Sequence, residues 1–370
     1  MELFGWNFNR IIFIFVLLHF FCVKIVFSQT APVGRSLFLN ANTYPERCKL
    51  YIDQTAKVTF SAAKISTVRF GFIYVAARLL RGTDESYALS KLDSLVDRAS
   101  LKLESPVSVQ YFTLYQLMHT FMLCRHKIPP ALQEKIKNFM ESYSYNFAWG
   151  GTLNLTIMPH AAAYMAAQTW PDFQDASNRN ATTILSYSGN ILSGYLSDFF
   201  HEGCYEVDSP IYYSTNITPV RMLADFATDP NFQRQARSAY HAMLLGMVGA
   251  YNKGLYVATP SRSKNWDQLG DGLRSPQSLH VINWFFHGSA TESIFYRPGS
   301  SNESFNFWIA YPGYTQPLPE MLLTGNERTF PYVRLGYQRK YTYQSNQFGL
   351  ATWDVHTKRE DHFRESKGNY

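Results

Sequence analysis

Cysteine and charge are both scarce in this chain of 370 residues. The four cysteines are not paired at the spacing of metal ligands, and the ten histidines form neither His-x-x-His nor His-Glu-x-x-His, so no metal site and no cofactor is predicted. Charged residues make up 17% of the chain and hydrophobic residues 46%, which excludes a disordered or fibrous protein. The formal net charge of +6 is spread out, without the basic stripe expected of a nucleic-acid-binding protein.

Long apolar runs are missing except near the N-terminus. Arg10 precedes an apolar run over 11–23, and small side chains follow at Val26 and Ser28, the positions that signal peptidase reads. We therefore predict a cleaved secretory signal, with cleavage before Gln29 and no stable membrane insertion afterwards. The alternative is an uncleaved signal anchor, if the apolar segment continues to Phe27.

Sequence features in the rest of the chain are consistent with secretion. Cys48, Cys124 and Cys204 remain after cleavage, so at most one disulfide can form. There are four Asn-x-Ser/Thr sequons, and the predicted glycan sites are Asn180, Asn216 and Asn302, with Asn154 as the fourth sequon. Cleavage lowers the net charge to +5, because two basic residues and one acidic residue are lost (34 − 2 against 28 − 1). A mildly basic secreted protein favours an acidic polysaccharide or oligosaccharide as its partner.

Helical periodicity dominates after a loop-like segment that ends near Val58. Apolar residues recur at i, i+3 and i+4, and helix-start signals such as Ser-Pro and Asp-Pro separate the periods. Because a proline deep in a helix is unfavourable, the pattern around Thr218-Pro219 predicts a helix that restarts at Pro219. Helices are expected over 61–81 and 85–100, from 106 and from 130, over 155–170 and 180–201, from 219, and over 230–251 and 277–287.

Alternate helices begin near 61, 106, 154 and 209, an interval of roughly fifty residues. Paired helices at this period are typical of an open solenoid or a closed α/α toroid, and the unequal connecting loops favour the toroid. From Phe330 the sequence alternates in the manner of β-strands. The prediction is a mainly α fold, with a signal peptide at 1–28, an (α/α) toroid of helical hairpins at 29–328 and a short or truncated β-strand segment at 329–370.

One polar stretch between two helical patterns is the first candidate for a functional site. Within His201–Asp229, two acids and two phenols fall close together, namely Glu206, Asp208, Tyr212 and Tyr213. Polar side chains at the start of a helix are a common way to build a site on a rigid scaffold. The alternative is a surface loop with half-buried tyrosines and solvated acids.

Three stretches resemble the toroidal domains of secreted polysaccharide lyases of the alginate lyase, chondroitin lyase and heparinase type. They are WGGTLNLTIMPHAAAYMAAQTWPD from Trp149, EVDSPIY from Glu206, and TPSRSKNW from Thr259, which is followed by VINWFFHG. The resemblance extends over roughly 61–354. It implies cleavage of a uronate-containing polysaccharide by β-elimination.

The resemblance also implies roles for individual residues. Asn154 would neutralise the uronate carboxylate, which makes the C5 proton acidic enough to be removed. Tyr212 would serve as acid or base, Arg262 would activate Tyr212 or hold the substrate, and Glu206 would orient the reacting group. The implied substrate-binding residues are Tyr213, Asp208, Trp266 and Trp284.

The sequence departs from the lyase pattern next to Asn154. Leu153 and Leu155 occupy the positions where the family often has Glu and His. His160 lies six residues beyond Asn154, which on an α-helix is a rotation of about 240°, so it would not point the same way. Asn154 itself could instead be a helix cap or carry a glycan, and a glycan would exclude it from a binding cleft.

Two other functions fit the same scaffold. A glycoside hydrolase would use a carboxylate pair such as Glu206 with Asp267 or Asp271, one protonated and one ionised. A carbohydrate-binding relative without activity is the other alternative, because of the leucines that flank Asn154.

Overall fold

The computed structural model describes the chain in segments: 41–59, 68–102, 107–145, 152–201, 212–248, 251–252, 255–256, 284–286, 305–311, 313, 328–335, 338–344 and 349–355. The chain divides into two units, Met1–Asn40 and Ala41–Tyr370, and all described residues belong to the second. The predicted signal peptide at 1–28 lies outside the described residues. The described part is mainly helical.

The first described helix was not expected from the sequence. Helix α3 spans Tyr44–Ala56, where a loop was predicted. Thr43 and Glu46 form a capping box at its start: the Thr43 hydroxyl accepts from the Glu46 amide, and the Glu46 carboxylate accepts from the Thr43 amide. Pro45 lies in the first turn, where its missing N–H costs nothing, so this proline helps to start the helix.

The helices that follow agree with the hydrophobic pattern. In α5, the side chains of Leu92, Leu95 and Val96 are fully buried, so the apolar stripe of this helix faces the core as predicted. The structure gives these bounds: α4 Val68–Arg81, α5 Glu85–Ser100, α6 Val107–Cys124, α7 Pro130–Glu141, α8 Leu153–Thr169, α9 Ala181–His201, α10 Tyr213–Phe226 and α11 Pro230–Val248.

The prediction that a helix restarts at Pro219 was wrong. Helix α10 begins at Tyr213 and contains Pro219, just as α8 contains Pro159. Each proline is the seventh residue of its helix, beyond the first turn where proline is tolerated without loss. Burial of nearly every residue of α10 compensates for the hydrogen bond that Pro219 cannot donate.

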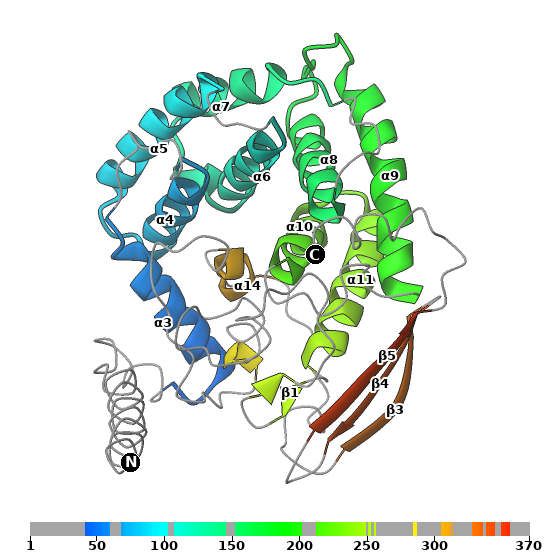
Figure 1. Cartoon of the computed structure of the whole chain (residues 1–370). Helices are drawn as coiled ribbons and strands as arrows, with labels where there is room; N and C mark the ends of the chain where they lie inside the picture. The colour runs from blue at the N-terminus through cyan, green and yellow to red at the C-terminus, as the bar shows by residue number, and fades with distance from the viewer. Residues whose placement is uncertain are drawn as a thin grey trace, which may run out of the picture. The chain divides into compact units, whose positions relative to one another are not determined.

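The helices form two layers, which Figure 1 shows from one end. Helices α3, α4, α6, α8 and α10 contact one another in succession, and α5, α7, α9 and α11 lie outside them. Neighbouring helices of the inner layer run in the same direction, as contacts between their C-terminal parts indicate. Arg81 pairs with Asp53 across α4 and α3, and Phe121 at the end of α6 packs on Trp170 just beyond α8.

A short segment from late in the sequence fills the space between the inner helices. It comprises residues 305–311, here called the central segment, and includes the helical turn α14, Phe307–Ala310. Every residue of the central segment is buried, and α14 contacts both α3 and α10. Phe305 packs edge-on against Phe70 of α4 and Phe112 of α6, and Trp308 stacks on His119 with ring centroids 4.0 Å apart.

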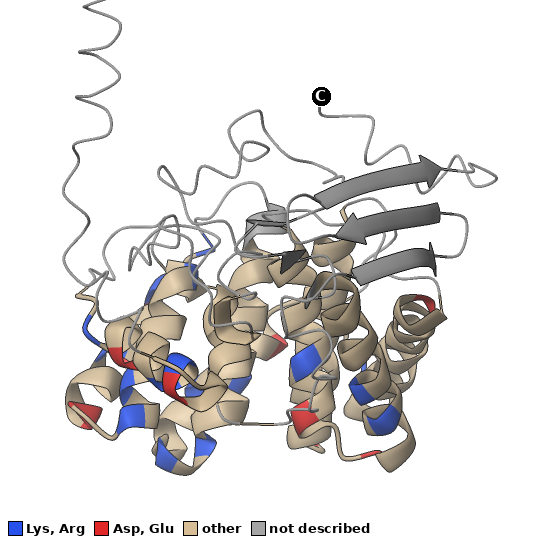
Figure 2. Cartoon of the chain, turned by 90° about the horizontal axis from the view of Figure 1, so that it is seen from below, with Lys and Arg blue, Asp and Glu red and all other residues tan. Residues whose placement is uncertain are grey.

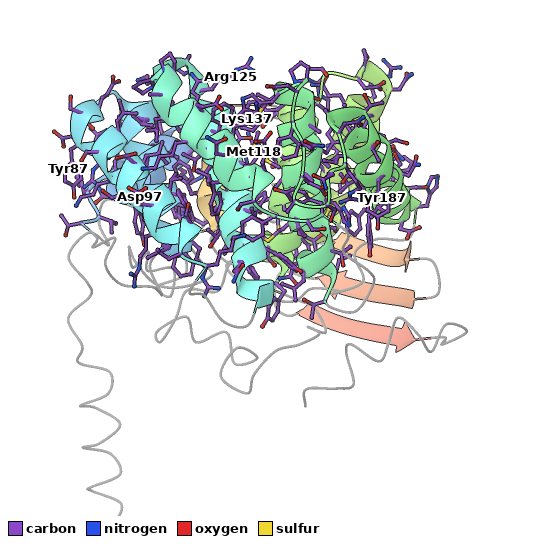
Figure 3. All side chains as sticks on the ribbon, turned by 90° about the horizontal axis from the view of Figure 1, so that it is seen from above. Tyr87, Asp97, Met118, Arg125, Lys137 and Tyr187 are labelled. Carbon is purple, nitrogen blue, oxygen red and sulfur yellow. The ribbon has the colours of Figure 1, made fainter. Side chains whose placement is uncertain are left out.

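Charged side chains of both signs lie along the outer parts of the described helices. Figure 2 shows lysines and arginines scattered along the helices with acids between them. Several pair across neighbouring helices, such as Lys135 of α7 with Asp93 and Asp97 of α5. In Figure 3, Tyr87 on α5 and Tyr187 on α9 lie at the outside, while Met118 on α6 lies between helices. The exterior of the described helices therefore carries charge of both signs.

The described strands are short and antiparallel. β1 Tyr251–Asn252 pairs with β2 Leu255–Tyr256. Strands β3 Arg328–Leu335, β4 Gln338–Gln344 and β5 Gly349–Val355 form a sheet in that order, with a register irregularity between Phe330 and Val333. Among the described residues, no helix is both long and apolar enough to cross a membrane. Of the helix expected over 277–287, only 284–286 are described, and they form a helical turn.

Candidate functional site

Two of the predicted site residues lie at the same end of neighbouring helices. Asn154 is the second residue of α8, and Tyr212 is the N-cap of α10. Near the other end, the Gln168 side chain donates to the Phe226 carbonyl at 2.9 Å. Asn154 precedes Gln168 by 14 residues and Tyr212 precedes Phe226 by 14, a helical rise of about 21 Å in each case. Because α8 and α10 run in the same direction, Asn154 and Tyr212 lie at about the same height along the two helix axes.

Asn154 lies inside the fold. Its side chain is 1% exposed, and its amide oxygen accepts a hydrogen bond from the Thr152 hydroxyl. This bond turns the amide NH₂ group away from Thr152. A glycan cannot be attached to so buried a side chain in the folded chain, which removes the alternative reading of Asn154 as a glycosylated residue.

Asn216 is likewise enclosed, in the first turns of α10. The side chain of Asn216 has no exposed surface, so we no longer expect a glycan there. Asn180 is exposed beside the start of α9, where its side-chain oxygen accepts from the Thr183 amide at 2.9 Å. Asn180 therefore remains compatible with the predicted modification. Asn302 lies outside the described residues.

Tyr212 and Tyr213 have different environments, although they are adjacent. Tyr212 is half-buried, and its carbonyl accepts from the Asn216 amide at 3.1 Å and from the Thr215 hydroxyl at 2.7 Å. Tyr213 is 5% exposed, and its hydroxyl donates to the Met243 carbonyl of α11 at 2.7 Å. The prediction that Tyr213 binds substrate was therefore wrong. The Tyr213 hydroxyl instead forms a hydrogen bond that links α10 to α11.

Trp284 is another predicted substrate-binding residue that the structure places in the core. Its side chain is fully buried and packs against Phe285, with ring centroids 5.5 Å apart. The Phe285 carbonyl in turn accepts from the Arg47 guanidinium of α3 at 2.8 Å. Trp284 is thus a packing residue. The other candidates, Glu206, Asp208, Arg262 and Trp266, together with Asp267, Asp271 and Cys204, lie outside the described residues.

His160 is a core residue of α8. It is fully buried, and its Nδ1 atom lies 3.2 Å from the Ser188 hydroxyl of α9. Burial, with a smaller contribution from the positive charge of Arg179, lowers the pKa of His160 to about 4. The ring is therefore uncharged at neutral pH. A neutral histidine between two packed helices does not replace the family histidine whose position Leu155 occupies.

The sequence analysis missed a buried ion pair on α10. Arg221 has no exposed surface, and its Nε atom lies 3.3 Å from the Asp225 carboxylate, one turn further along the helix. The guanidinium also donates to the Ile309 carbonyl at 2.6 Å and to the Tyr311 carbonyl at 3.0 Å. These bonds attach the central segment to α10. The four-residue spacing of Arg221 and Asp225 was the visible signal, but it is equally typical of a solvated helix face.

Aromatic polar groups extend this ion pair into a network. The Tyr311 hydroxyl donates to Asp225 and lies 3.3 Å from Nε2 of His119. Nδ1 of His119 lies 2.8 Å from the Tyr115 hydroxyl. Burial and the charge of Arg221 lower the pKa of His119 well below its usual value, and burial, with the charge of Asp225, raises the pKa of Tyr311. Both groups are neutral, so the network holds one positive and one negative charge that neutralise each other.

A cavity of 620 Å³ lies beside this network, between α3, the end of α4 and the segment after α14. Its lining includes Tyr44 and Cys48 from α3 and Gly313 beyond the central segment. Among the described residues, no group of three or more His, Cys, Asp or Glu side chains is arranged to hold a metal ion. Cys48 and Cys124 are both buried free thiols in the described part of the chain.

No family model, curated protein or solved structure matches this chain.

Proposed function

We propose that the inner and outer helices form a closed α/α toroid. The successive contacts from α3 to α10 support this, because α14 then contacts both the first and the last helix of that series. The common direction of the inner helices means that equivalent helix ends lie on one side. Loops at that side can therefore form one binding surface.

We further propose that the protein is a secreted polysaccharide lyase-like enzyme acting on uronate-containing polysaccharide. The observation that carries the proposal is the matched level of Asn154 and Tyr212 at the N-terminal ends of α8 and α10, which the Gln168 bond to Phe226 sets. A donor for the uronate carboxylate and a phenol for proton transfer are the two groups that the elimination needs first. Here they come from helices that contact each other.

Each of these residues would have a defined role in the proposed elimination. The NH₂ group of Asn154 would donate to the uronate carboxylate and stabilise the negative charge that develops when the C5 proton leaves. Tyr212 would either accept that proton or supply one to the departing oxygen, and water would make the other of these two transfers. The electrons of the C5–H bond form the C4–C5 double bond as the C4–O bond breaks. By the resemblance, Glu206 and Arg262 would orient and activate these groups.

The test is an assay of the purified chain against uronate polymers such as alginate, chondroitin sulfate and heparin. Elimination creates a double bond conjugated with the carboxylate, so the product absorbs in the ultraviolet. Polymer cleavage with rising ultraviolet absorbance is the expected result. Cleavage that produces reducing ends without this absorbance would identify a hydrolase and overturn the lyase proposal.

A second candidate function is carbohydrate binding without turnover. Asn154 is 1% exposed and is flanked by Leu153, which is itself buried, so the carboxylate-neutralising group is enclosed. Retardation of the protein in gels that contain a uronate polymer, with no change in polymer length, would favour this function over catalysis.

We propose that the chain is exported and that its partner is an acidic glycan. The support is the N-terminal pattern at Arg10 and the apolar run behind it, together with the mildly basic charge. N-terminal sequencing of the exported product should read from Gln29. A soluble product that begins at Met1 would overturn this.

A further inference from the structure

The cavity beside α3 has an apolar wall. Tyr44, Cys48 and Ile52 line it from α3, and their four-residue spacing puts them on one face of that helix. Leu80 of α4 and Ala310 of the central segment add further apolar surface. The volume of 620 Å³ falls within the range of about 300–1,000 Å³ that is usual for small-molecule sites. The cavity can therefore hold the apolar body of a small molecule.

The rim of the cavity carries an excess of positive charge. Asp53 lies between Lys49 and Arg81, with N–O distances of 3.1 Å and 3.0 Å. Two cations thus share one carboxylate, and the other described residues that line the cavity are uncharged, which leaves a net charge of +1 (2 − 1) on the described lining. Arg81 is the better enclosed of the two cations, because its side chain is 32% exposed against 78% for Lys49.

We propose that this cavity is a binding site for a small amphipathic monoanion, a carboxylate with an aromatic or aliphatic body. The body would lie along Cys48 and Ile52, and the carboxylate would lie at the rim beside Arg81. An arginine already held by one carboxylate is fixed in place, so little side-chain entropy is lost when a second anion binds. The proposal does not depend on the lyase function.

The charge of the rim decides between ligand classes. A cationic ligand would have to compete with both Lys49 and Arg81 for Asp53. A neutral ligand would gain only the burial of its apolar surface. An anion gains the same burial and also neutralises the surplus charge, so the head group should distinguish two ligands with identical bodies.

The first experiment is titration calorimetry with 4-phenylbutyrate and with its neutral analogue, 4-phenylbutanamide. The carboxylate should bind about tenfold more tightly than the amide, as expected for one charge-assisted hydrogen bond. In Arg81→Gln this preference should fall to near parity. The matched control is Arg125→Gln, since Arg125 is exposed at the outer edge of the helices (Figure 3) and does not line the cavity. Equal binding of the two compounds to the wild-type chain, or no binding of either, overturns the proposal.

The second experiment locates the ligand without any substitution. Burial raises the pKa of the Cys48 thiol to about 11 and that of Cys124 to about 12, so both should react slowly with methyl methanethiosulfonate at mildly alkaline pH. Cys48 lines the cavity, whereas Cys124 does not. Peptide mapping should show that 4-phenylbutyrate slows the modification of Cys48 severalfold and leaves that of Cys124 unchanged. Unchanged modification of Cys48 at saturating ligand overturns the assignment of the site.

Discussion

Arg221 and Asp225 form an ion pair inside the protein, with side chains that are 0% and 5% exposed. The pair lies one turn apart on α10, and the guanidinium also binds two carbonyls of the central segment. The buried guanidinium of Arg221 therefore helps to hold the central segment, and with it the cavity wall that this segment forms, in position.

Replacement of Asp225 should therefore destabilise the fold strongly. In Asp225→Asn, Arg221 remains buried without its counter-ion, so we expect a loss of about 3–5 kcal/mol in the free energy of unfolding, measured with urea. Asp93→Asn is the matched control, because Asp93 is an exposed partner of Lys135 and should cost less than about 1 kcal/mol. A loss at Asp225 no greater than at Asp93 would contradict this account.

Gly313 should not tolerate a side chain. A Cβ atom there would lie 2.7 Å from the Asp225 carboxylate, 2.8 Å from the Tyr311 ring and 3.0 Å from the Arg221 guanidinium. Gly313→Ala is expected to cost about 1–3 kcal/mol, the usual range for an overpacked site. Gly194→Ala provides the contrast, since nothing lies within 4 Å of its Cβ position in α9. That variant should gain up to about 1 kcal/mol in thermal or urea unfolding.

The stability of the protein should depend on pH through His160. The pKa of His160 is about 4 in the folded state against 6.5 for a free histidine. Between pH 4 and pH 6.5 this side chain therefore binds more protons in the unfolded chain than in the folded chain. The stability that His160 contributes should thus be constant above pH 6.5 and decline as the pH falls toward 4, by a total on the order of 3 kcal/mol. His160→Gln should make this decline shallower in urea titrations at each pH, and the remaining decline should come from His119, whose pKa burial also lowers. Replacement of the exposed His126 by Gln should leave the decline intact.

Phenylalanine variants of the adjacent Tyr212 and Tyr213 should distinguish a catalytic hydroxyl from a structural one. If the proposed function is right, Tyr212→Phe should reduce turnover of uronate polymer by about 10²–10⁴-fold with an unchanged melting temperature. Tyr213→Phe removes the hydroxyl that donates to Met243, so it should cost about 1 kcal/mol of stability and leave turnover intact. Full activity in a folded Tyr212→Phe variant would reject the catalytic role.

The sequence was informative wherever a helix had a strong apolar period and a clear start. The bounds of α5 were predicted as Glu85–Ser100 because a Gly-Thr-Asp break and a regular leucine pattern mark both the start and the face of that helix. Helix α3 was missed because its capping signal at Thr43 was treated as part of a loop. The start of α10 was misplaced, since local sequence rules cannot anticipate that packing on every side will keep Pro219 within a helix.

The sequence alone determined that the chain is mainly helical, because hydrophobic periodicity is a local property. Only the tertiary structure decided which polar residues are enclosed. Tyr213 and Trp284 read as substrate contacts in the sequence, yet each is buried by residues distant from it in the chain. Arg221 was not singled out in the sequence, yet it is enclosed and highly connected. Its partners Ile309 and Tyr311 lie 88 and 90 residues away, so no local pattern could reveal these contacts. Burial and long-range hydrogen bonds arise from packing between elements, which one-dimensional spacing does not encode.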